Sequence, residues 1–583
     1  MSRSRSGGRL DSRLALAALV ATVALGCSDE RSDAGPGAAD PLPPDAGVGA
    51  DAPLDLSYLC GNRFLVANAR TVAVSVTYRV AGTGETGVVE VAAAPLEDPA
   101  VSEQEIETRA RGTVEILLEG RHVVARANEA VPCTPPPAPS AALVASAAES
   151  GIWTAPTTWP IVGVHVILLP NGKVLAVGRK GNPQVWDPAS GSFSAVPSPT
   201  WLFCAGHALL PDGRVFFAGG HISDNHGLPN LTLFSPTGNS WATGSRMARG
   251  RWYPTTTVMG NGDVVILAGR DEAGVEVQIP EVWSNGSVRR LTGAPRTLPY
   301  YPRAFLAPDG RLYVAGPARP TRFLSLSGSG AWQSGPSRLF GAREYGSAVM
   351  YEDGKILYAG GSRTTNTAEV IDLNLAKPVW KWTGSMANAR RHLNLTVLPT
   401  GEVLATGGVG GTTFNDLSRP VRAGEIWNPA SGQWATLASS SVVRGYHATA
   451  LLLPDGRVLH AGSGDGAGAP NQLNAELFSP PYLSRGARPT ISSAPTSVAY
   501  GSRFRVLTPQ ASAITRVTLI RLGAATHAFD ENQRFQRLSF TADATGLTVT
   551  TPNSRNRTPP GHYMLFILNG NNVPAVARII RIS

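Results

Sequence analysis

The sequence predicts an all-β protein: a seven-bladed β-propeller flanked by a small N-terminal β-domain and a C-terminal immunoglobulin-like β-sandwich. Two observations support this prediction. The 583 residues include 63 Gly and 46 Pro but only 16% charged residues, which favours many short strands joined by turns, in more than one domain. In addition, a pattern of two apolar runs around a glycine turn recurs seven times along the chain, which is typical of propeller blades.

The chain opens with an export signal. Four arginines within the first 13 residues precede the apolar run LALAALVATVALG, which ends at Cys27 and is too short to cross a bilayer comfortably. We expect residues 1–27 to be a signal peptide. Its ending, ALGC, resembles the lipobox of bacterial lipoproteins, which implies lipid attachment at Cys27; cleavage without lipid is the alternative. The protein is thus expected at the bacterial cell envelope, as an outer-membrane lipoprotein, or in secreted form.

The segment that follows, residues 28–54, is rich in Pro, Gly and Asp, and this composition predicts a disordered linker. The formal net charge of +9 comes without any block of Lys and Arg. We therefore expect no nucleic-acid partner, and contact with a membrane only through the lipid anchor.

The four cysteines bear on the N-terminal domain. In an oxidising compartment two of them should pair, and Cys60 and Cys133 bracket several strand-like runs. We pair them across a small β-domain at residues 55–135, which is followed by a linker at residues 136–151. Cys204 is then left over, and a buried, inert thiol is the simplest interpretation of it.

Repeated units define the central domain. Examples are LLPDGRVFFAGG and MYEDGKILYAGG, and the seven turn glycines are Gly172, Gly213, Gly262, Gly310, Gly354, Gly401 and Gly456. Their period of roughly 40 to 55 residues matches kelch-type blades of four strands. We assign residues 152–485 to a seven-bladed kelch propeller. Residues 486–583 carry alternating runs such as ITRVTLIRLG and YMLFILN, which predict the C-terminal sandwich.

The glycine turns also predict a ring of side chains. The first strand of each blade lines the central channel of a propeller, so residues at a fixed offset before the turn glycines should meet at one mouth of the channel. Nine positions before the seven glycines stand Gly163, Cys204, Tyr253, Tyr301, Tyr345, His392 and His447. We call these seven the ring positions. Channel-filling aromatic residues would explain one or two of them but not the set.

At these residues the sequence resembles the copper radical oxidases, a family that includes galactose oxidase and glyoxal oxidase. Four separated motifs carry the resemblance, in the family's order: WLFCAG around Cys204, RGRWYP around Tyr253, RGYHATALLLPDGRV around Tyr446 and His447, and ATHAFDENQR around His527. The resemblance covers the predicted propeller and the C-terminal domain.

The resemblance implies a site for one Cu(II) per chain. Tyr253, Tyr446, His447 and His527 would be the ligands, with His527 contributed by the C-terminal domain. Cys204 would be joined to Tyr253 by a thioether bond, and this pair would be the radical cofactor, which would account for the leftover thiol. Neutral imidazoles and phenolate oxygens also suit Cu(II) on chemical grounds.

The reaction that the family implies is oxidation of a primary alcohol or small aldehyde by O2, giving aldehyde or acid and hydrogen peroxide. Tyr446 would accept the hydroxyl proton of the substrate as the base, and the Tyr253 radical would abstract hydrogen from the substrate carbon. The expected partners are this small-molecule substrate and O2, and we expect a monomer.

Residues of a substrate pocket are assigned by looser alignment to the family. Phe414 lies where galactose oxidase has an aromatic substrate contact, with a loop anchor as the alternative. Arg338 and Arg343 are candidates for the family's substrate-binding arginine, and an exposed surface position is the alternative for each. Asp271 stands near the place of the tryptophan that stacks over the thioether in galactose oxidase. This departure implies altered radical stability, and activity on small alcohols or aldehydes above activity on galactose.

Four further residues are of interest. His221 and His226 have a spacing that could suit a second metal, but a polar rim loop is the preferred interpretation. Tyr345 and His392 have no role implied by the family, so we interpret them as pocket wall or as hydrogen-bonding partners of the ligands.

Two other classes of function stay open. A kelch propeller without catalytic activity could be a binding module of the cell envelope, which predicts no copper and a free thiol at Cys204. A hydrolase with a zinc site is the other alternative, but the carboxylate or third histidine that zinc usually takes is not evident at the ring positions.

Overall fold

The computed structural model describes residues 54–68, 70, 72–93, 102–128, 131, 133–135, 147–362 and 364–583. Within these residues the protein is almost entirely β-structure, with one helical turn, α1 (Ala147–Ser150), and two 3-10 turns, η1 (Pro481–Ser484) and η2 (Ala511–Ala513). The all-β prediction is confirmed. Among the described segments, no helix is long and apolar enough to cross a membrane. The predicted signal peptide with Cys27 and most of both predicted linkers lie outside these segments.

Seven antiparallel sheets follow one another from residue 152 to residue 479. The first sheet contains β10 (His165–Leu168), β11 (Val174–Val177), β12 (Gln184–Trp186) and β13 (Phe193–Ala195). The second contains β14 (Gly206–Leu209), β15 (Val215–Ala218), β16 (His221–Ser223), β17 (His226–Ser235) and β18 (Ser240–Arg251). The third contains β19 (Thr255–Val258), β20 (Val264–Leu267), β21 (Glu281–Ser284) and β22 (Ser287–Arg290).

The next four sheets repeat the same meander. The fourth sheet contains β23 (Arg303–Leu306), β24 (Leu312–Gly316), β25 (Arg322–Ser325) and β26 (Ala331–Ser334), and the fifth contains β27 (Ser347–Glu352), β28 (Lys355–Ala359), β29 (Ala368–Asp372) and β30 (Trp380–Thr383). The sixth contains β31 (Asn394–Val397), β32 (Val403–Thr406), β33 (Ala423–Asn428) and β34 (Gln433–Ser439). The seventh contains β35 (Ala448–Leu452), β36 (Val458–Gly462) and β37 (Asn474–Ser479). The early strands β8 (Ile152–Trp153) and β9 (Thr157–Thr158) pair with β37.

Glycine chemistry explains why the seven units fold alike. Each turn glycine has a φ between 71° and 92°, a conformation that glycine adopts without the steric cost that a Cβ would bring. The flanking strands are short and buried on both faces, because each sheet packs between two others; Val174–Val177 and Val264–Leu267 are examples. This burial is the reason that the first two strands read as continuous apolar runs.

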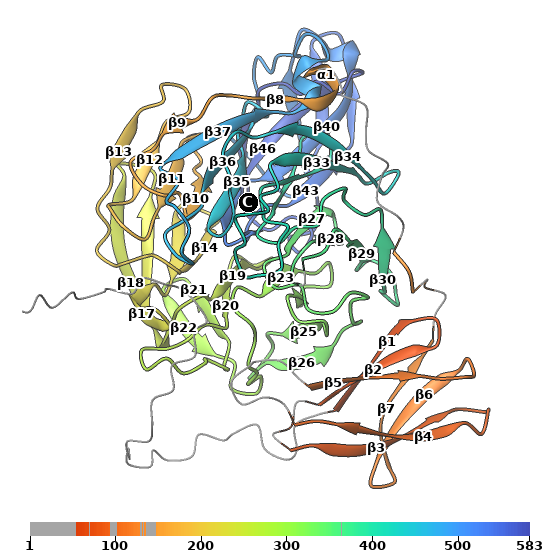
Figure 1. Cartoon of the computed structure of the whole chain (residues 1–583). Helices are drawn as coiled ribbons and strands as arrows, with labels where there is room; N and C mark the ends of the chain where they lie inside the picture. The colour runs from red at the N-terminus through yellow and green to blue at the C-terminus, as the bar shows by residue number, and fades with distance from the viewer. Residues whose placement is uncertain are drawn as a thin grey trace, which may run out of the picture.

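The seven sheets lie around a common centre (Figure 1), and their first strands are the innermost. Successive first strands from β14 to β35 contact one another, and β35 also contacts β10. Because β8 and β9 come from the start of this region and pair with β37, the two ends of the chain segment meet in the seventh sheet.

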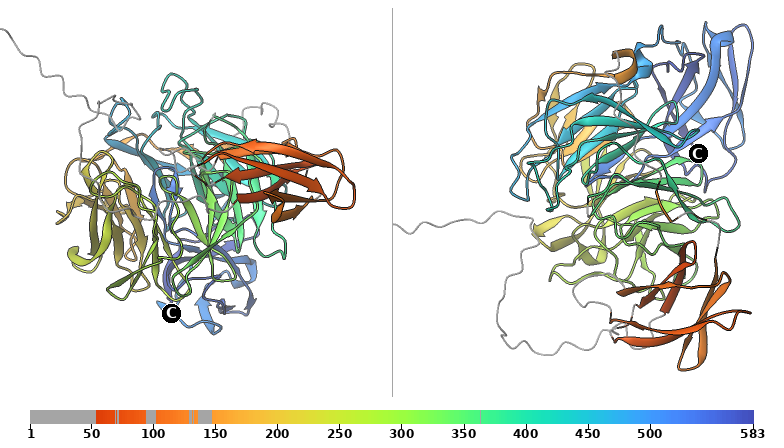
Figure 2. Two further views of the ribbon diagram at one scale, coloured as in Figure 1. Left: turned by 90° about the horizontal axis from the view of Figure 1, so that it is seen from below. Right: turned by 45° about the vertical axis from the view of Figure 1, so that its right-hand side comes forward.

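The C-terminal domain consists of two facing sheets with a core of their own, and it lies against one face of the ring of sheets (Figure 2). Its strands are β38 (Ser497–Val498), β39 (Arg503–Leu507), β40 (Ile514–Arg521), β43 (Phe535–Leu538), β44 (Phe540–Ala542), β45 (Gly546–Thr550), β46 (Gly561–Asn569) and β47 (Arg578–Ile582).

One hairpin leaves this domain and enters the centre of the ring. It consists of β41 (Ala524–Thr526) and β42 (Phe529–Asp530). β41 pairs with β10 and contacts β14 and β35, whereas β42 contacts β27 and β31. The hairpin therefore lies among the innermost strands and carries its tip, residues 527 and 528, to the middle of the molecule.

The N-terminal domain has two sheets and packs at the edge of the ring (Figures 1 and 2). Its strands are β1 (Leu54–Cys60), β2 (Arg63–Asn68) and β5 (Ser102–Glu107) in one sheet, and β3 (Val74–Val80), β4 (Thr86–Val91), β6 (Thr113–Leu118) and β7 (Arg121–Ala127) in the other. The predicted disulfide between Cys60 and Cys133 is present.

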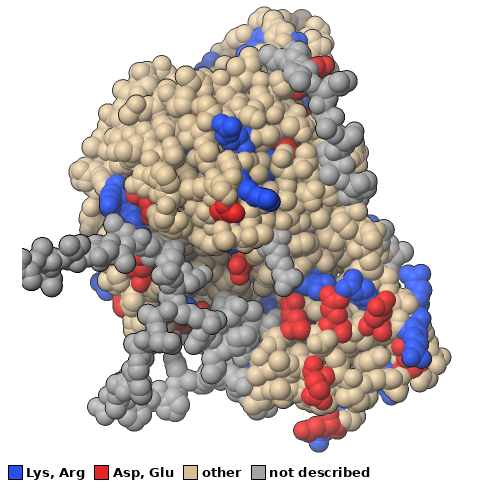
Figure 3. All heavy atoms as spheres, in the orientation of Figure 1, with Lys and Arg blue, Asp and Glu red and all other residues tan. Residues whose placement is uncertain are grey.

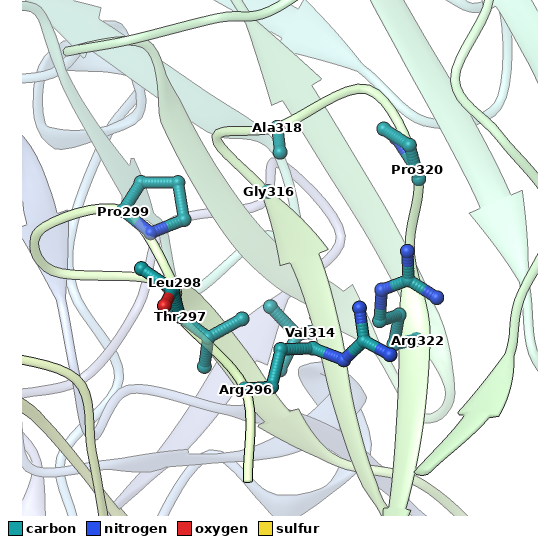
Figure 4. Close-up of a pocket in the computed structure, with 9 residues that line it drawn as sticks. All are labelled: Arg296, Thr297, Leu298, Pro299, Val314, Gly316, Ala318, Pro320 and Arg322. Atoms are coloured by element: carbon teal, nitrogen blue, oxygen red, sulfur yellow. The ribbon is translucent and has the colours of Figure 1, made fainter. Parts of the chain in front are cut away.

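Charge complementarity joins this domain to the ring of sheets. Acidic side chains of the domain face basic ones across the junction (Figure 3), and Arg319 Nη1 lies 2.7 Å from Glu105 Oε1. Arg322 pairs with Asp55 at 3.4 Å and, together with Arg296, lines a small pocket beside this contact (Figure 4). These ion pairs join the N-terminal domain to the fourth sheet.

Candidate metal centre

The ring positions have an unusual backbone conformation. Six of the seven have a positive φ: 61° at Cys204, 65° at Tyr253, 45° at Tyr301, 51° at Tyr345, 61° at His392 and 66° at His447. A residue with a Cβ in this region costs about 1–2 kcal/mol, and such residues gather at functional sites. Backbone hydrogen bonds between neighbouring ring positions stabilise this strained conformation. The Tyr253 amide donates to the Cys204 carbonyl at 2.9 Å, and the Tyr301 amide donates to the Tyr253 carbonyl at 3.1 Å.

His447 presents one free ring nitrogen. Its Nδ1 lies 2.7 Å from the carbonyl oxygen of Gly464, which requires the proton to sit on Nδ1. Its Nε2 is buried and has no hydrogen-bond partner among the described residues. Burial lowers the pKa of His447 to about 3, so the ring is neutral and its Nε2 lone pair is available to a metal.

His527 reaches the same place from the hairpin tip. Its φ of 44° and the φ of 64° at Ala528 fit the two central residues of a type I′ turn, since Thr526 pairs with Phe529. The Thr526 hydroxyl donates to the Val164 carbonyl at 3.0 Å and so accepts from His527 Nδ1 at 2.6 Å. Nε2 is thus the unprotonated nitrogen, and burial lowers the pKa of His527 well below its ordinary value.

The two tyrosines complete the group. His527 Nε2 lies 3.1 Å from the hydroxyl of Tyr253, and that hydroxyl is in hydrogen-bond contact with the hydroxyl of Tyr446. The rings of Tyr446 and His447 stack with centroids 3.8 Å apart, and the two imidazoles are 4.6 Å apart. Two imidazoles and two phenol oxygens, all from buried residues, therefore converge.

This donor set fits Cu(II). The orphaned Nε2 of His447 is a buried polar atom that a metal would satisfy, and nitrogen and oxygen donors of this kind favour copper in the affinity order of divalent metals. Within the part of the chain that the structure describes, no group of three or more His, Cys, Asp or Glu could hold a metal. A metal at this centre would consequently need the tyrosines as ligands, which disfavours a zinc hydrolase site.

Cys204 lies beside Tyr253. It is fully buried, takes no part in a disulfide and packs in one apolar cluster with Tyr253, Trp252 and Phe203. The Tyr253 ring is also covered by its neighbour Trp252, with centroids 3.9 Å apart at 45°. The geometry thus brings together the cysteine and tyrosine for which the sequence predicts a crosslink.

Phe414 lies next to the centre. It is half-buried, and its ring centroid is 4.9 Å from that of Tyr446 and 5.0 Å from that of Tyr345. His392 Nε2 lies 2.6 Å from the Phe414 carbonyl. Tyr345 and His392 therefore form a wall with Phe414 beside Tyr446, consistent with the expectation for these ring residues.

Arg338 and Arg343 lie in the protein interior. Both are fully buried, and both approach Glu369 Oε1, at 3.6 Å and 2.7 Å respectively. Arg343 also donates to the carbonyl of Gly360 at 2.8 Å. Since breaking these bonds would leave a buried carboxylate unpaired, we do not retain either arginine as a substrate contact; the sequence does not reveal the pairing with Glu369.

Asp271 shapes a loop. Its Oδ1 accepts hydrogen bonds from the amides of Ala273 and Val275, each at 2.9 Å, and the side chain is buried. It contributes no ring over Tyr253, as expected from the missing tryptophan. His221 is buried and its Nδ1 accepts from Trp252 Nε1 at 3.1 Å, outside the rim loop, whereas His226 Nδ1 lies 2.8 Å from the Asp224 carbonyl within that loop.

Three residues of the centre have no signal in the sequence pattern. Asn415 Oδ1 accepts from the Tyr446 amide at 3.1 Å. Arg303 donates to the His527 carbonyl at 3.1 Å and holds the hairpin tip. Arg391 lies over the Phe414 ring at 5.1 Å. Only its place directly before His392 could have pointed to Arg391.

Two family models match parts of the chain. The family described as "Glyoxal oxidase N-terminus" matches residues 363–482, and the family described as "Galactose oxidase-like, Early set domain" matches residues 488–582. A galactose oxidase of Gibberella zeae is 31% identical over an alignment of 441 residues, which covers 68% of this chain and 64% of that protein. The chain thus spans just under two thirds of the length of that relative.

Two further relatives match at lower identity. An aldehyde oxidase named GLOX, of Vitis pseudoreticulata, is 29% identical over 445 residues, covering 66% of this chain and 82% of that protein. The solved structure of a fungal alcohol oxidase in complex with copper has a TM-score of 0.68 and 24% identity, and covers 75% of this chain and all of that one. This last likeness concerns the fold.

Proposed function

Because the chain belongs to the family of galactose oxidase and glyoxal oxidase, we propose that it is an exported copper radical oxidase. It oxidises a primary alcohol or small aldehyde with O2 and yields aldehyde or acid and hydrogen peroxide. The observation that carries this proposal is the convergence of the imidazoles of His447 and His527 with the phenols of Tyr253 and Tyr446.

In this proposal one Cu(II) is held by His447, His527, Tyr253 and Tyr446. Each imidazole is fixed in the right tautomer by a hydrogen bond on its Nδ1, to Gly464 or to Thr526, so no rearrangement is needed for Nε2 to bind. When bound, copper supplies the one-electron chemistry that protein side chains lack.

The two tyrosines have separate tasks. The Tyr446 oxygen, which would be a phenolate when it holds copper, takes the proton of the substrate hydroxyl; it lies at the centre of the site, in contact with the Tyr253 hydroxyl. The Tyr253 side chain, oxidised to a radical, takes a hydrogen atom from the substrate carbon, and the one electron that then remains on the substrate would pass to copper. Burial of both rings excludes water from the reacting atoms.

We include in the proposal a thioether bond between Cys204 and Tyr253. Its formation joins sulfur to a ring carbon and removes two hydrogens, one from the thiol and one from the ring, with O2 as the oxidant that becomes hydrogen peroxide. The shared apolar cluster and the hydrogen bond between the two backbones support this pairing. If the protein were only a binding module, Cys204 would keep its thiol.

The proposal extends to architecture and location. The seven sheets are the blades of one kelch-type propeller at residues 152–485, supported by the contacts between their first strands, and residues 486–583 form an immunoglobulin-like sandwich supported by its two facing sheets. The protein is a monomer, exported through residues 1–27 and anchored at the cell envelope by lipid on Cys27. Partition into detergent that is lost in C27A would support the anchor; unmodified, soluble wild type would refute it.

A peroxide-coupled assay on copper-loaded protein tests the function. The panel contains polyols, benzylic alcohols, small aldehydes and galactose; we expect activity on small alcohols or aldehydes above activity on galactose, because Asp271 stands where galactose oxidase has a stacking tryptophan. Tyr446→Phe should retain copper and the crosslink but lower kcat strongly, because the base is gone. Wild type that binds no copper and makes no peroxide would return the protein to the class of binding modules.

A further inference from the structure

Buried arginines recur in the sheets around the centre. In four sheets an arginine two or three positions before a ring position pairs with a glutamate on the third strand. The pairs are Arg251–Glu281 at 2.9 Å, Arg343–Glu369 at 2.7 Å, Arg390–Glu425 at 2.5 Å and Arg444–Glu476 at 3.5 Å. Each buried positive charge in this set therefore has its own carboxylate.

Arg391 differs from this pattern. It is only 7% exposed, yet in the described segments it has no ion pair and its Nε has no hydrogen-bond partner. All the other arginines that are buried to this degree donate at least one side-chain hydrogen bond to another residue. Arg390, the neighbour of Arg391 in the chain, donates to the Gly407 carbonyl, and Arg303 donates to the His527 carbonyl at the hairpin tip. The two Nη groups of Arg391 are not among the buried atoms without a partner, so they are accessible to a ligand, and the missing carboxylate points to an anionic one.

The position of Arg391 is fixed by its surroundings. Its backbone forms a two-way bridge with Val409, with N–H to O distances of 3.0 Å and 2.9 Å. Its guanidinium carbon lies 5.1 Å from the centroid of the Phe414 ring and 5.8 Å from that of Tyr345. Both of these rings contact Tyr446, so the charge stands one side chain away from the proposed base.

A second donor without an acceptor lies on the same wall. Asn415 follows Phe414, and its Oδ1 accepts from the Tyr446 amide at 3.1 Å. This bond sets the orientation of the amide and leaves Nδ2, which is buried and has no partner in the described residues. A carboxylate accepts hydrogen bonds from an amide and from a guanidinium.

Burial and two neighbouring side chains act on the charge of Arg391 in opposite directions. Burial lowers the pKa of its guanidinium, and the nearby Glu344 and Tyr345 side chains act in the opposite direction. Few charged side chains lie on the middle of the face that Figure 3 shows.

We propose that Arg391 binds a carboxylate of the substrate, so that the enzyme prefers small alcohols or aldehydes that carry a carboxylate to their neutral counterparts. This inference rests on the proposed oxidase function. For 4-(hydroxymethyl)benzoate the balanced reaction is alcohol plus O2 to 4-formylbenzoate plus hydrogen peroxide. The alcohol loses two electrons and two protons to O2, and the carboxylate is unchanged.

The kinetic test compares 4-(hydroxymethyl)benzoate with its methyl ester, which has the same skeleton without the charge. In wild type we expect a higher kcat/KM for the acid than for the ester. Arg391→Met should lower kcat/KM for the acid at least 10-fold, through KM, and change that for the ester less than 2-fold. Arg214→Met, at an exposed turn, is the matched control and should change neither. An unchanged ratio in R391M would overturn the proposal.

Two further measurements keep the result unambiguous. If R391M also loses turnover of the ester, Arg391→Lys, which keeps the charge, decides: restored turnover of the ester with a preference for the acid supports the proposal, and an equal loss of turnover of both substrates overturns it. Calorimetry on copper-free protein should show binding of 4-(hydroxymethyl)benzoate that R391M weakens at least 10-fold. If wild type binds 4-(hydroxymethyl)benzoate but has no oxidase activity, the proposed function is refuted and the carboxylate site is retained. If wild type has oxidase activity but does not bind this compound, only the carboxylate site is refuted.

Discussion

His527 Nε2 lies 3.1 Å from the hydroxyl of Tyr253, although 274 residues separate the two in the chain. Tyr253 lies two residues before β19, the first strand of the third sheet, and His527 lies at the tip of a hairpin of the C-terminal domain. The proposed metal centre therefore exists only when the hairpin is docked among the first strands.

A first prediction concerns this relationship. His527→Gln removes one of two imidazole donors, so we expect copper affinity to fall at least 100-fold while the fold is retained. Isothermal calorimetry with Cu(II) measures it. His221→Gln alters a buried histidine outside the donor set and should leave the affinity within 3-fold; equal affinities of H527Q and wild type would contradict the assigned ligands.

A second prediction concerns the crosslink. Copper-loaded, oxygen-treated wild type should yield a joined peptide containing Cys204 and Tyr253, lighter by two hydrogens than the separate peptides. Cys204→Ser should remove the joined peptide and most turnover, but leave copper bound, because the sulfur is not among the proposed ligands. Mass spectrometry checks the peptide. A Cys204 that still reacts fully with a thiol reagent after unfolding of treated wild type would sink the radical-oxidase assignment.

Parts of this centre can be predicted from local spacing, and parts cannot. The offset from each glycine turn places the ring positions, because every first strand begins at the same level of its sheet. His527 lies outside that repeat, so only resemblance to a family identifies it. Arg338 and Arg343 are not pocket residues because Glu369 lies beside them in space. Arg391, in contrast, has no glutamate in ion-pair contact among the described residues. Such pairings between distant segments leave no periodic trace in the sequence.

A third prediction concerns Arg303. This buried guanidinium donates to the carbonyls of Tyr301, Gly346 and His527, at 2.6, 2.9 and 3.1 Å, and so ties two ring strands to the hairpin tip. Arg303→Met leaves these acceptors unsatisfied, which costs about 1–3 kcal/mol for each group that water cannot reach. We expect lower copper affinity as well, because His527 loses its support.

The control for Arg303 is another buried arginine away from the hairpin. Arg338→Met removes donors from the carbonyls of Pro317 and Ala318. It should destabilise the fold in urea unfolding but leave the Cu(II) dissociation constant unchanged. If both variants weaken copper binding equally, Arg303 has only a general structural role.

A fourth prediction follows from a buried histidine outside the centre. Neither ring nitrogen of His460 has a hydrogen-bond partner in the described residues, and burial, with Arg444 and Arg390 nearby, lowers its pKa well below the ordinary 6.5. As pH falls through 6.5 the unfolded chain takes up a proton at this residue and the folded protein does not, so stability falls on acidification. His460→Phe should reduce this slope by up to about 1.4 kcal/mol per pH unit. Urea unfolding of copper-free protein between pH 6.5 and 4 measures the slope, and an unchanged slope would contradict the prediction.

The last prediction concerns strain in the turn that presents His527. Ala528 has a φ of 64° as the second central residue of the turn between Thr526 and Phe529, where a Cβ costs about 1–2 kcal/mol relative to glycine. Ala528→Gly removes that cost but gives the unfolded chain more freedom, which offsets roughly 0.4–1 kcal/mol. We therefore expect a net gain of about 0.5–1 kcal/mol in the free energy of unfolding, whereas Ala528→Val should lose at least as much because β-branched residues are poorly tolerated at positive φ. Urea unfolding of the two variants without copper measures both effects, and copper titration should show a weaker site only in A528V. A glycine variant that is less stable than wild type would mean that the turn is not strained at this residue.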